Sequence, residues 1–318
     1  MRPIRSRPSP LTRIRRRSAL TALALVACAA ACSAQQDPDR SYAPAIPRPS
    51  FAPGRGPLVL IDEGHHEFHT RAGRYSAFAN LIERDGFVVR AHAGRLDRAS
   101  LGRARVLVVA NALAARNEQD WSLPVDPAFD EREVTAVRDW VRDGGALFLV
   151  ADHMPFPGAA AGLAAAFGFR FENGFAYDAA GRSTFDARRD AGLHAGPVAD
   201  GRGADERVDS VRVFTGQAFR ADAAVDTIVS LGAGAYSLFP RVAWEFSDST
   251  RRESSAFALV GAARSFGRGR VVVFGEAAMF TAQVAGPNRV RMGMNDPGAP
   301  HNHRLALNVV RWLAGVLD

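Results

Sequence analysis

The sequence predicts an α/β protein in which a parallel sheet is flanked by helices, with a partly antiparallel elaboration around residues 168–253. Short apolar runs alternate along the chain with helical patterns, which is typical of a parallel α/β sheet. Between residues 168 and 253 this alternation gives way to successive short β patterns. With 47% hydrophobic and 23% charged residues, the composition is that of a globular domain.

The first strands and helices of this fold follow from local patterns. Four apolar runs are expected strands, at residues 57–61, 87–89, 105–110 and 146–151. A helix is expected over residues 73–85, where Tyr75, Phe78 and Ile82 share one face and Gly86 follows as a terminator. Asp130 and Glu133 form the capping-box pattern of a second helix, which ends at Gly144. An Ala-rich helix is expected over residues 158–167.

The second half is predicted in the same way. Within the elaboration, strands are expected at residues 208–215, 227–231 and 241–246. Two more strands are expected at residues 255–260 and 270–274, around a Gly-Arg-Gly turn at residues 267–269. A final helix over residues 302–316 carries Leu305, Val309, Trp312 and Val316 on one face. Residues 57–318 are therefore expected to form one domain.

The N-terminal residues have the three parts of an export signal. Residues 1–34 begin with an Arg-rich stretch, continue with the apolar run 19–31 and end in small residues that permit cleavage. The apolar run is shorter than the ~20 residues of a durable membrane anchor. Residues 25–28, LVAC, resemble a bacterial lipobox with Cys28 as the lipidated residue, and cleavage after Ala34 is the alternative. We expect an exported protein, periplasmic or lipid-anchored in the bacterial cell envelope.

A proline-rich stretch follows the leader. Residues 35–56 contain prolines at positions 38, 44, 47, 49 and 53 and almost no apolar periodicity. Such a composition is typical of an extended linker. The sequence therefore predicts a tether that joins a lipid anchor to the domain at residue 57, so that the membrane is contacted through the anchor alone.

The charge of the chain excludes one class of partner. The formal net charge is +7, and no lysine is present, so arginine supplies all of the positive charge. Residues 1–34 hold seven arginines and no acidic residue, which leaves 33 arginines against 33 acidic residues in the remainder. This balance predicts no binding to nucleic acid. The only cysteines are Cys28 and Cys32, so the folded part offers no thiol nucleophile.

Polar residues follow four of the expected strands. They are Asp62 and Glu63, Asn111, Asp152 and His153, and Glu276. Because ligands of open α/β sheets bind beyond the carboxyl ends of the strands, we expect these side chains to line one cleft. Glu63, Asp152, His153 and Glu276 are the candidate catalytic side chains, and ordinary helix caps and solvated loops are the alternative. Asp62, His66, Asn111, Gln283, Asn295 and His303 are the candidate ligand-binding side chains.

The loop after the first strand, residues 62–69 (DEGHHEFH), suggests a metal. Imidazole and carboxylate groups are ligands of zinc and similar divalent ions. His65 and His69 would share a face if the segment were helical, which makes them the candidate ligands of a divalent metal such as Zn²⁺. His66 and His69 are one residue too close for the His-Glu-x-x-His zinc motif. Gly64 favours a loop, in which the histidines position a ligand instead.

Several segments together resemble a known family. LIDEGHHEFHT, GGALFLVADHMPFPGAA, VFTGQAF and VVVFGEAAMFTAQ, with the stretch GMNDPGAPHNHRLALNVVRWLAG, resemble bacterial domains of unknown function in the class I glutamine-amidotransferase-like superfamily. These domains are distantly related to trehalose-utilisation-like proteins. The resemblance covers nearly all of residues 57–318 and implies a flavodoxin-like fold. The superfamily's nucleophilic Cys would lie in the turn at Asp152 and His153, where this chain has none, so glutaminase activity is not expected.

Three functions remain open on the sequence. The first is a ligand-binding module of the cell envelope for a small molecule, with carbohydrate or glycan fragments as the ligand class. The second is a metal-assisted hydrolase, in which Glu63 or Asp152 acts as the general base and His65, His66 or His153 binds metal or serves as the acid. The third is a structural or protein-interaction module that uses the 168–253 elaboration.

Overall fold

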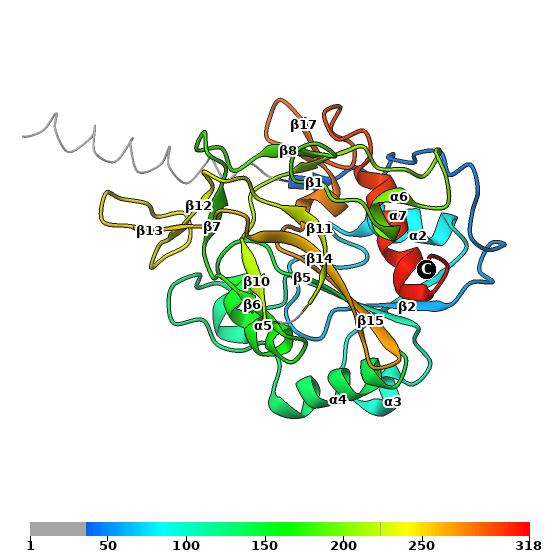
Figure 1. Ribbon diagram of the computed structural model, residues 1–318. Helices are drawn as coiled ribbons and strands as arrows, with labels where there is room; N and C mark the ends of the chain where they lie inside the picture. Colours follow the sequence, from blue (N-terminus) through cyan, green and yellow to red (C-terminus); the bar gives the residue numbers. More distant parts are fainter. Residues whose placement is uncertain (1–35, 223) are drawn as a thin grey trace, which may run out of the picture.

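The computed structural model describes residues 36–222 and 224–318 (Figure 1). The predicted signal peptide of residues 1–34, with its lipidation site Cys28 and its alternative cleavage site after Ala34, lies outside the described residues. Within the described part of the chain, no helix combines the length and the apolar character that a membrane span requires.

The central sheet has nine strands in the order β3-β2-β4-β5-β15-β14-β10-β6, with β11 also paired to β14. The parallel strands are β2 (Leu58–Asp62), β3 (Val88–His92), β4 (Val106–Ala110), β5 (Ala146–Val150) and β15 (Gly269–Phe274). The antiparallel strands are β14 (Leu259–Phe266), β10 (Phe219–Ala221), β6 (Phe169–Phe171) and β11 (Asp226–Ser230). Numbered along the chain, the parallel strands lie in the flavodoxin-like order 2-1-3-4-5, which confirms the predicted fold class.

Helices cover both faces of this sheet (Figure 1). On one face, Val106 and Val108 of β4 pack in a core that includes α2 (Ser76–Arg84), α6 (Pro197–Asp200) and α7 (Asn302–Ala314). On the other face, Leu107 and Val109 pack with α3 (Arg98–Leu101), α4 (Glu131–Arg142) and α5 (Phe156–Ala165). Because successive side chains of a strand point to opposite faces, this strand must be apolar throughout.

The predicted start of α4 is confirmed in detail. The Asp130 side chain accepts the backbone N–H groups of Arg132 and Glu133, and the Glu133 side chain accepts the N–H of Asp130. This capping box satisfies N–H groups that have no partner within the helix. It also fixes Glu133 at the first turn of α4, facing the carboxyl edge of the sheet.

The elaboration after α5 is antiparallel, as expected, but its strands differ from those predicted. A three-stranded sheet contains β7 (Phe175–Tyr177), β12 (Tyr236–Phe239) and β13 (Arg251–Ser254), and β8 (Phe185–Arg188) pairs with β9 (Ser210–Val213). The strand predicted at residues 241–246 is wrong, because Pro240 follows β12 directly and Trp244 has a left-handed φ of 71°. The strand predicted at residues 255–260 begins only at Leu259.

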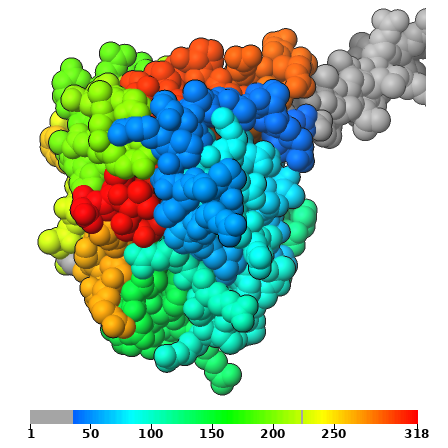
Figure 2. Space-filling model, turned by 90° about the vertical axis from the view of Figure 1, so that its right-hand side faces the viewer, coloured from blue at the N-terminus to red at the C-terminus, as the bar shows by residue number. Residues whose placement is uncertain are grey.

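The predicted tether is also wrong, because residues 36–56 belong to the folded domain. β1 (Gln36–Pro38) pairs antiparallel with β16 (Ala282–Ala285), which pairs with β17 (Val290–Gly293). Further along, the Phe51 ring packs edge-on against Phe87 at 5.1 Å between centroids. Figure 2 shows this blue segment lying on the surface beside the red C-terminal part. Tyr42, Ile46 and Phe51 contact the core although their spacing has no regular period.

A buried ion pair fixes the segment before β2 to the last helix. Arg311 of α7 donates from Nε and Nη2 to the two carboxylate oxygens of Asp85, at 2.9 and 2.7 Å. Ser50 donates to the same carboxylate from its backbone N–H and its hydroxyl, at 2.9 and 2.8 Å. Both charged side chains are buried, and removing one partner of such a pair leaves an uncompensated charge.

We expect the Arg311→Met variant to lose about 3–5 kcal/mol of unfolding free energy, because the substitution leaves the Asp85 carboxylate buried without its cation. Urea unfolding at neutral pH, compared with the wild type, measures this loss. Arg304→Met on the same helix is the control, since Arg304 donates to the exposed Arg207 carbonyl and not to a buried carboxylate of the described residues, and it should change stability by less than about 1 kcal/mol. A loss of similar size in both variants would contradict the assignment.

Candidate functional site

The loop after β2 lies at the topological switch point of the sheet. The connection after β2 runs into α2 on one face, and the connection after β4 leads to α4 on the other face. Residues 63–69 cross the gap between these two strands: the Phe68 N–H donates to the Asn111 carbonyl at 3.0 Å, and the Leu113 N–H donates to the His65 carbonyl at 2.8 Å. In flavodoxin-like sheets this gap is where ligands bind.

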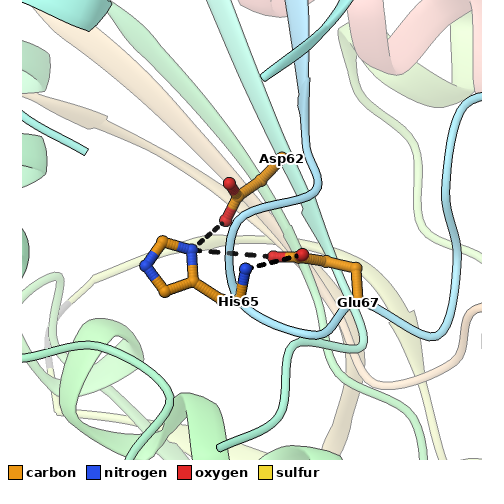
Figure 3. A group of neighbouring side chains, drawn as sticks. All are labelled: Asp62, His65 and Glu67. Atoms are coloured by element: carbon orange, nitrogen blue, oxygen red, sulfur yellow. Dashed lines mark hydrogen bonds and ion pairs between the residues drawn. The ribbon is translucent and has the colours of Figure 1, made fainter. Parts of the chain in front are cut away.

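Four side chains, which we call the switch-point cluster, meet here: Asp62, His65, Glu67 and Glu133. His65 Nδ1 lies 2.7 Å from Asp62 Oδ2 and 3.8 Å from Glu67 Oε1, and the His65 backbone N–H donates to Glu67 Oε2 (Figure 3). On the other side of the ring, His65 Nε2 lies 3.1 Å from Glu133 Oε1. One imidazole thus contacts three carboxyl groups, and all four side chains are buried.

Burial and these contacts shift two pKa values of the cluster. Desolvation lowers the pKa of His65, but hydrogen bonds and charge from Asp62 and Glu133 outweigh it, so the pKa lies above its ordinary value. Burial, reinforced by the neighbouring Asp62, raises the pKa of Glu67 to about 10. Glu67 therefore keeps its proton at neutral pH in the isolated protein.

The polar residues after the next three strands form a second group, the strand-end cluster of Asn111, Asp152, His153 and Glu276. Asn111 Oδ1 accepts the Asp152 N–H at 2.8 Å, and Asp152 Oδ1 accepts the His153 N–H at 2.7 Å. Asn111 has a left-handed φ of 58°, which a non-glycine residue rarely adopts. The structure therefore brings Asn111, Asp152 and His153 into contact at the ends of β4 and β5, and Glu276 lies at the end of the neighbouring β15.

Glu276 has a structural contact for each of its oxygens. Its carboxylate accepts the backbone N–H groups of Ala278 and Met279 at 2.6 and 2.8 Å, at the start of the short 3-10 helix η3 (Ala278–Phe280). The side chain is fully buried, and burial together with the nearby Asp152 raises its pKa. Burial also raises the pKa of Asp152 to about 7 and lowers the pKa of His153 to about 4. A neutral imidazole and carboxyl groups that hold protons near pH 7 are what general acid–base chemistry requires.

The structure separates the two histidines predicted to bind a metal together. A spacing of four residues brings two side chains to one face only in a helix, and residues 63–69 form none. His65 belongs to the switch-point cluster, whereas the His69 ring packs against Tyr75 at 4.9 Å and Phe68 at 5.6 Å. Burial and the positive Arg74 lower the pKa of His69 to about 3.

The remaining predicted residues lie around or away from the two clusters. Glu63 is half-buried and accepts the Arg71 N–H at 2.7 Å, and His66 is exposed with its ring 3.1 Å from Glu118. Asn295 donates to the Gln283 carbonyl and to Asp39, beside the β1–β16 pair. His303 lies elsewhere, in a pocket of about 310 Å³ between residues 44–48 and α7.

Sequence reasoning missed Glu67, Glu133 and an aromatic patch over His153. This patch contains Trp121, Trp244 and Phe246. The Trp244 ring lies 4.6 Å from the His153 ring, and Trp121 lies 6.1 Å from it. Trp244 is 51% exposed and Phe246 is 39% exposed. The sequence signal for the patch is the density of aromatic residues between positions 236 and 246, a stretch whose second half, residues 241–246, is predicted above as a strand.

Two open pockets adjoin these groups. A pocket of about 620 Å³ is lined by His65, His66, Arg95 and the first turn of α4, including Glu133. A second pocket of about 730 Å³ is lined mainly by the segment from Phe239 to Arg251 and by Glu172 and Asn173. The switch-point cluster thus borders the first pocket, and the chain segment that carries Trp244 and Phe246 forms the wall of the second.

Comparison with known proteins finds similarity of fold. The N-terminal domain of mmIFT52 aligns with 80% of this chain and 96% of its own length, at 12% identity and a TM-score of 0.55. A ThuA-like protein from Bacteroides uniformis aligns with 85% of this chain and 94% of its own length, at 11% identity and a TM-score of 0.47. A cytoplasmic protein from Salmonella typhimurium covers 81% of this chain, with 98% of its own length aligned, at 10% identity and a TM-score of 0.43.

These identities bear on the fold alone. No protein-family model and no curated protein sequence matches the chain. The family assignment itself stays a prediction.

The buried Asp152 should give the protein a distinctive pH dependence of stability. Its pKa is raised by folding, so its contribution to stability is present near pH 4 and is lost as the pH rises to about 7. His69 and His153 act in the opposite direction, because their lowered pKa values make stability fall as the pH falls below about 6.5.

The Asp152→Asn variant isolates the carboxyl group. We expect its unfolding free energy, relative to the wild type, to rise by about 2–4 kcal/mol between pH 4 and pH 8, because Asn carries no charge at either pH. Urea unfolding of both proteins across this range measures the difference. Asp222→Asn, at an exposed ion pair with Arg170, is the control and should show a flat difference. A flat profile for Asp152→Asn would show that this carboxyl ionises normally.

Proposed function

We propose that this protein is an exported module of the bacterial cell envelope that binds a small carbohydrate ligand at the aromatic patch over the strand ends, and that it has no glutaminase activity. The observation that carries the proposal is the exposed Trp244 ring, held in a strained backbone conformation beside His153. Aromatic faces next to hydrogen-bonding groups suit ligands that combine apolar ring faces with hydroxyl groups.

The position of Trp244 is costly for the fold. Its φ of 71° is unfavourable for a bulky side chain, and about half of the side chain lies exposed to solvent. The ring is nevertheless fixed, since it packs edge-on against Phe175 at 4.8 Å as well as against His153. Residues held in such conformations concentrate at functional sites, where the surrounding structure imposes them. Because the ring is fixed and about half exposed, a role in ligand binding explains its position better than a role in core packing does.

The pocket formed by the chain segment that carries Trp244 has a lining that suits a neutral, hydroxyl-rich ligand. It combines two aromatic residues, Phe171 and Phe239, with alcohol and amide groups from Ser247, Thr250 and Asn173. Its charged lining residues are Arg241 and Arg251 against Glu172, Glu245 and Glu253, so both signs are present. Such a mixture offers hydrogen-bond donors and acceptors on several sides, which is how sites recognise polar small molecules.

The remaining parts of the proposal rest on the sequence. Asp152 and His153 occupy the turn after β5, where an amidotransferase would carry its nucleophilic cysteine, and no cysteine occurs after Cys32. Export is supported by the arginine-rich start and apolar run of residues 1–34, and lipidation at Cys28 would supply the contact with the membrane. Nucleic acid is not a proposed partner.

The Trp244→Ala variant tests the ligand site. We expect the wild type to bind at least one member of a panel of neutral di- and trisaccharides with a Kd below about 1 mM. We expect Trp244→Ala to weaken that binding at least tenfold, because truncation removes a buried stacking surface worth ~1–2 kcal/mol in the complex. Isothermal titration calorimetry measures both constants.

Phe257→Ala is the matched control. Phe257 is also an exposed aromatic residue with a left-handed φ, at 71% exposure and 58°, but it does not belong to the aromatic patch over His153. Its substitution should leave the affinity unchanged. The proposal fails if no saccharide of the panel binds, or if the two variants weaken binding equally.

A metal-assisted or acid–base hydrolase is the second candidate. It is favoured by the position of His65, which lies between Asp62 and Glu133 and also lines the open pocket of about 620 Å³. We expect a screen of chromogenic glycosides and esters to find turnover that His65→Ala reduces at least 100-fold, the typical contribution of a positioned acid or base. Turnover that His65→Ala leaves intact would assign the activity elsewhere.

A further inference from the structure

We propose that Asp62, His65 and Glu67 bind one divalent transition-metal ion, with Zn²⁺ as the fitting example. The donor atoms are Asp62 Oδ2, His65 Nδ1 and Glu67 Oε1, and these atoms lie within 4.8 Å of one another. This site is distinct from the aromatic patch, and its assignment does not depend on the carbohydrate ligand.

The distances suit a small coordination sphere. With Zn–ligand bonds of about 2.0 Å and tetrahedral angles, two ligand atoms lie roughly 3.3 Å apart. The separations from His65 Nδ1 are 2.7 Å to Asp62 and 3.8 Å to Glu67, values on either side of that figure. Shifts of about half an ångström therefore bring each of these two pairs to the spacing of zinc ligands, and all three ligand atoms lie within 4.8 Å of one another. One imidazole nitrogen and two carboxylate oxygens leave the fourth position for water or another ligand.

Glu133 fixes the imidazole in the orientation that a metal requires. His65 Nε2 lies 3.1 Å from Glu133 Oε1, so a ring whose Nδ1 binds an ion can donate its Nε2–H to Glu133, while Nδ1 faces Asp62 and Glu67. Metal-binding histidines commonly donate their second ring N–H to a carboxylate in this manner. Glu133 is itself fixed by the capping box of α4, because it accepts the Asp130 N–H. Glu133 is thus a positioning residue.

Glu67 gives the independent indication of a ligand. Its side chain is fully buried, and Oε1 accepts no hydrogen bond from any residue in the part of the chain that the structure describes. This oxygen points toward the gap between Asp62 and the His65 ring (Figure 3). Burying a carboxyl oxygen without a partner is unfavourable, and a cation beside it removes that penalty. The charges agree, since two carboxylates neutralise a divalent ion.

The site adjoins an open pocket through one of its three ligands. His65 lines the pocket of about 620 Å³, which is also lined by Arg95 and the exposed His66. Asp62 ends β2, and the loop that supplies His65 and Glu67 is hydrogen-bonded at His65 and Phe68 to the chain after β4, so the ligands are preorganised.

Zn²⁺ titration of the full-length chain tests the site, in a Cys28→Ser, Cys32→Ser background that removes the two thiol ligands. We expect one Zn²⁺ per chain by isothermal titration calorimetry. Glu67→Gln should lower the Zn²⁺ affinity at least tenfold, because the amide is a poor metal ligand. Glu133→Gln should lower it about tenfold, in line with the loss of an orienting carboxylate.

The Glu67→Gln variant separates a metal role from a structural role. Gln has the shape of the protonated Glu, so in chelator the variant should melt at the wild-type temperature, and only the stabilisation by added Zn²⁺ should disappear. His66→Ala and His69→Ala are the controls, and both should bind Zn²⁺ as the wild type does. The proposal is overturned if the wild type binds no Zn²⁺, if Glu67→Gln binds it equally well, or if His69→Ala abolishes binding.

Discussion

The site depends on one constraint, which is that the central strands are buried on both faces of the sheet. Every side chain of β4 and β5 lies in one of the two cores, so neither strand can carry a polar group along its length. Polar residues occur instead where these strands end, and parallel strands all end at the same edge. The constraint that makes the sheet apolar thereby concentrates carboxyl, imidazole and amide groups within a few residues of one another.

The polar groups at this edge fall into layers with different roles. Glu276 and Asn111 accept backbone N–H groups, so they fix the turns after β15 and β5. His65 and Glu67 are buried as well, but they belong to a loop that borders an open pocket. Trp244 and Phe246 lie outermost. Rigid inner groups that hold a more accessible outer surface are the arrangement expected of a preorganised binding site.

Much of the fold could be predicted because the local sequence patterns match what each segment needs in the tertiary structure, such as burial on both faces of a strand. Continuous apolar runs identified β2, β4, β5 and β15, and the pair Asp130 and Glu133 identified the start of α4. Segment 36–56 could not be predicted in this way, since the partners of β1 lie more than 200 residues away and the prolines interrupt any regular spacing of Tyr42 and Phe51. The strand predicted at residues 241–246 was wrong because the apolar and aromatic residues there form a bend in which Trp244 packs against His153, not a strand.

The sequence indicated where the candidate site lies, but not which of its side chains contact one another. Asn111, Asp152, His153 and Glu276 meet because strand ends meet, which the alternation of elements indicates. The partners of His65 could not be predicted from local sequence, because Glu133 lies 68 positions further along the chain, in a helix that only the tertiary fold brings close. The spacing of His65 and His69 suggested a shared face, but a helix would be needed, and His66 has a left-handed φ of 50°. Loop geometry therefore decided which side chains meet.

The pairing of β1 with β16 constrains the order in which the chain can fold. Gln36 lies opposite Ala285, and Ser50 shares the Asp85 carboxylate with Arg311, so residues made first find partners among residues made last. During synthesis the N-terminal strand must wait, unpaired, until nearly the whole polypeptide has emerged. The last step of folding in this protein is therefore the pairing of β1 with β16 and the docking of the segment around Ser50 on the Asp85–Arg311 ion pair.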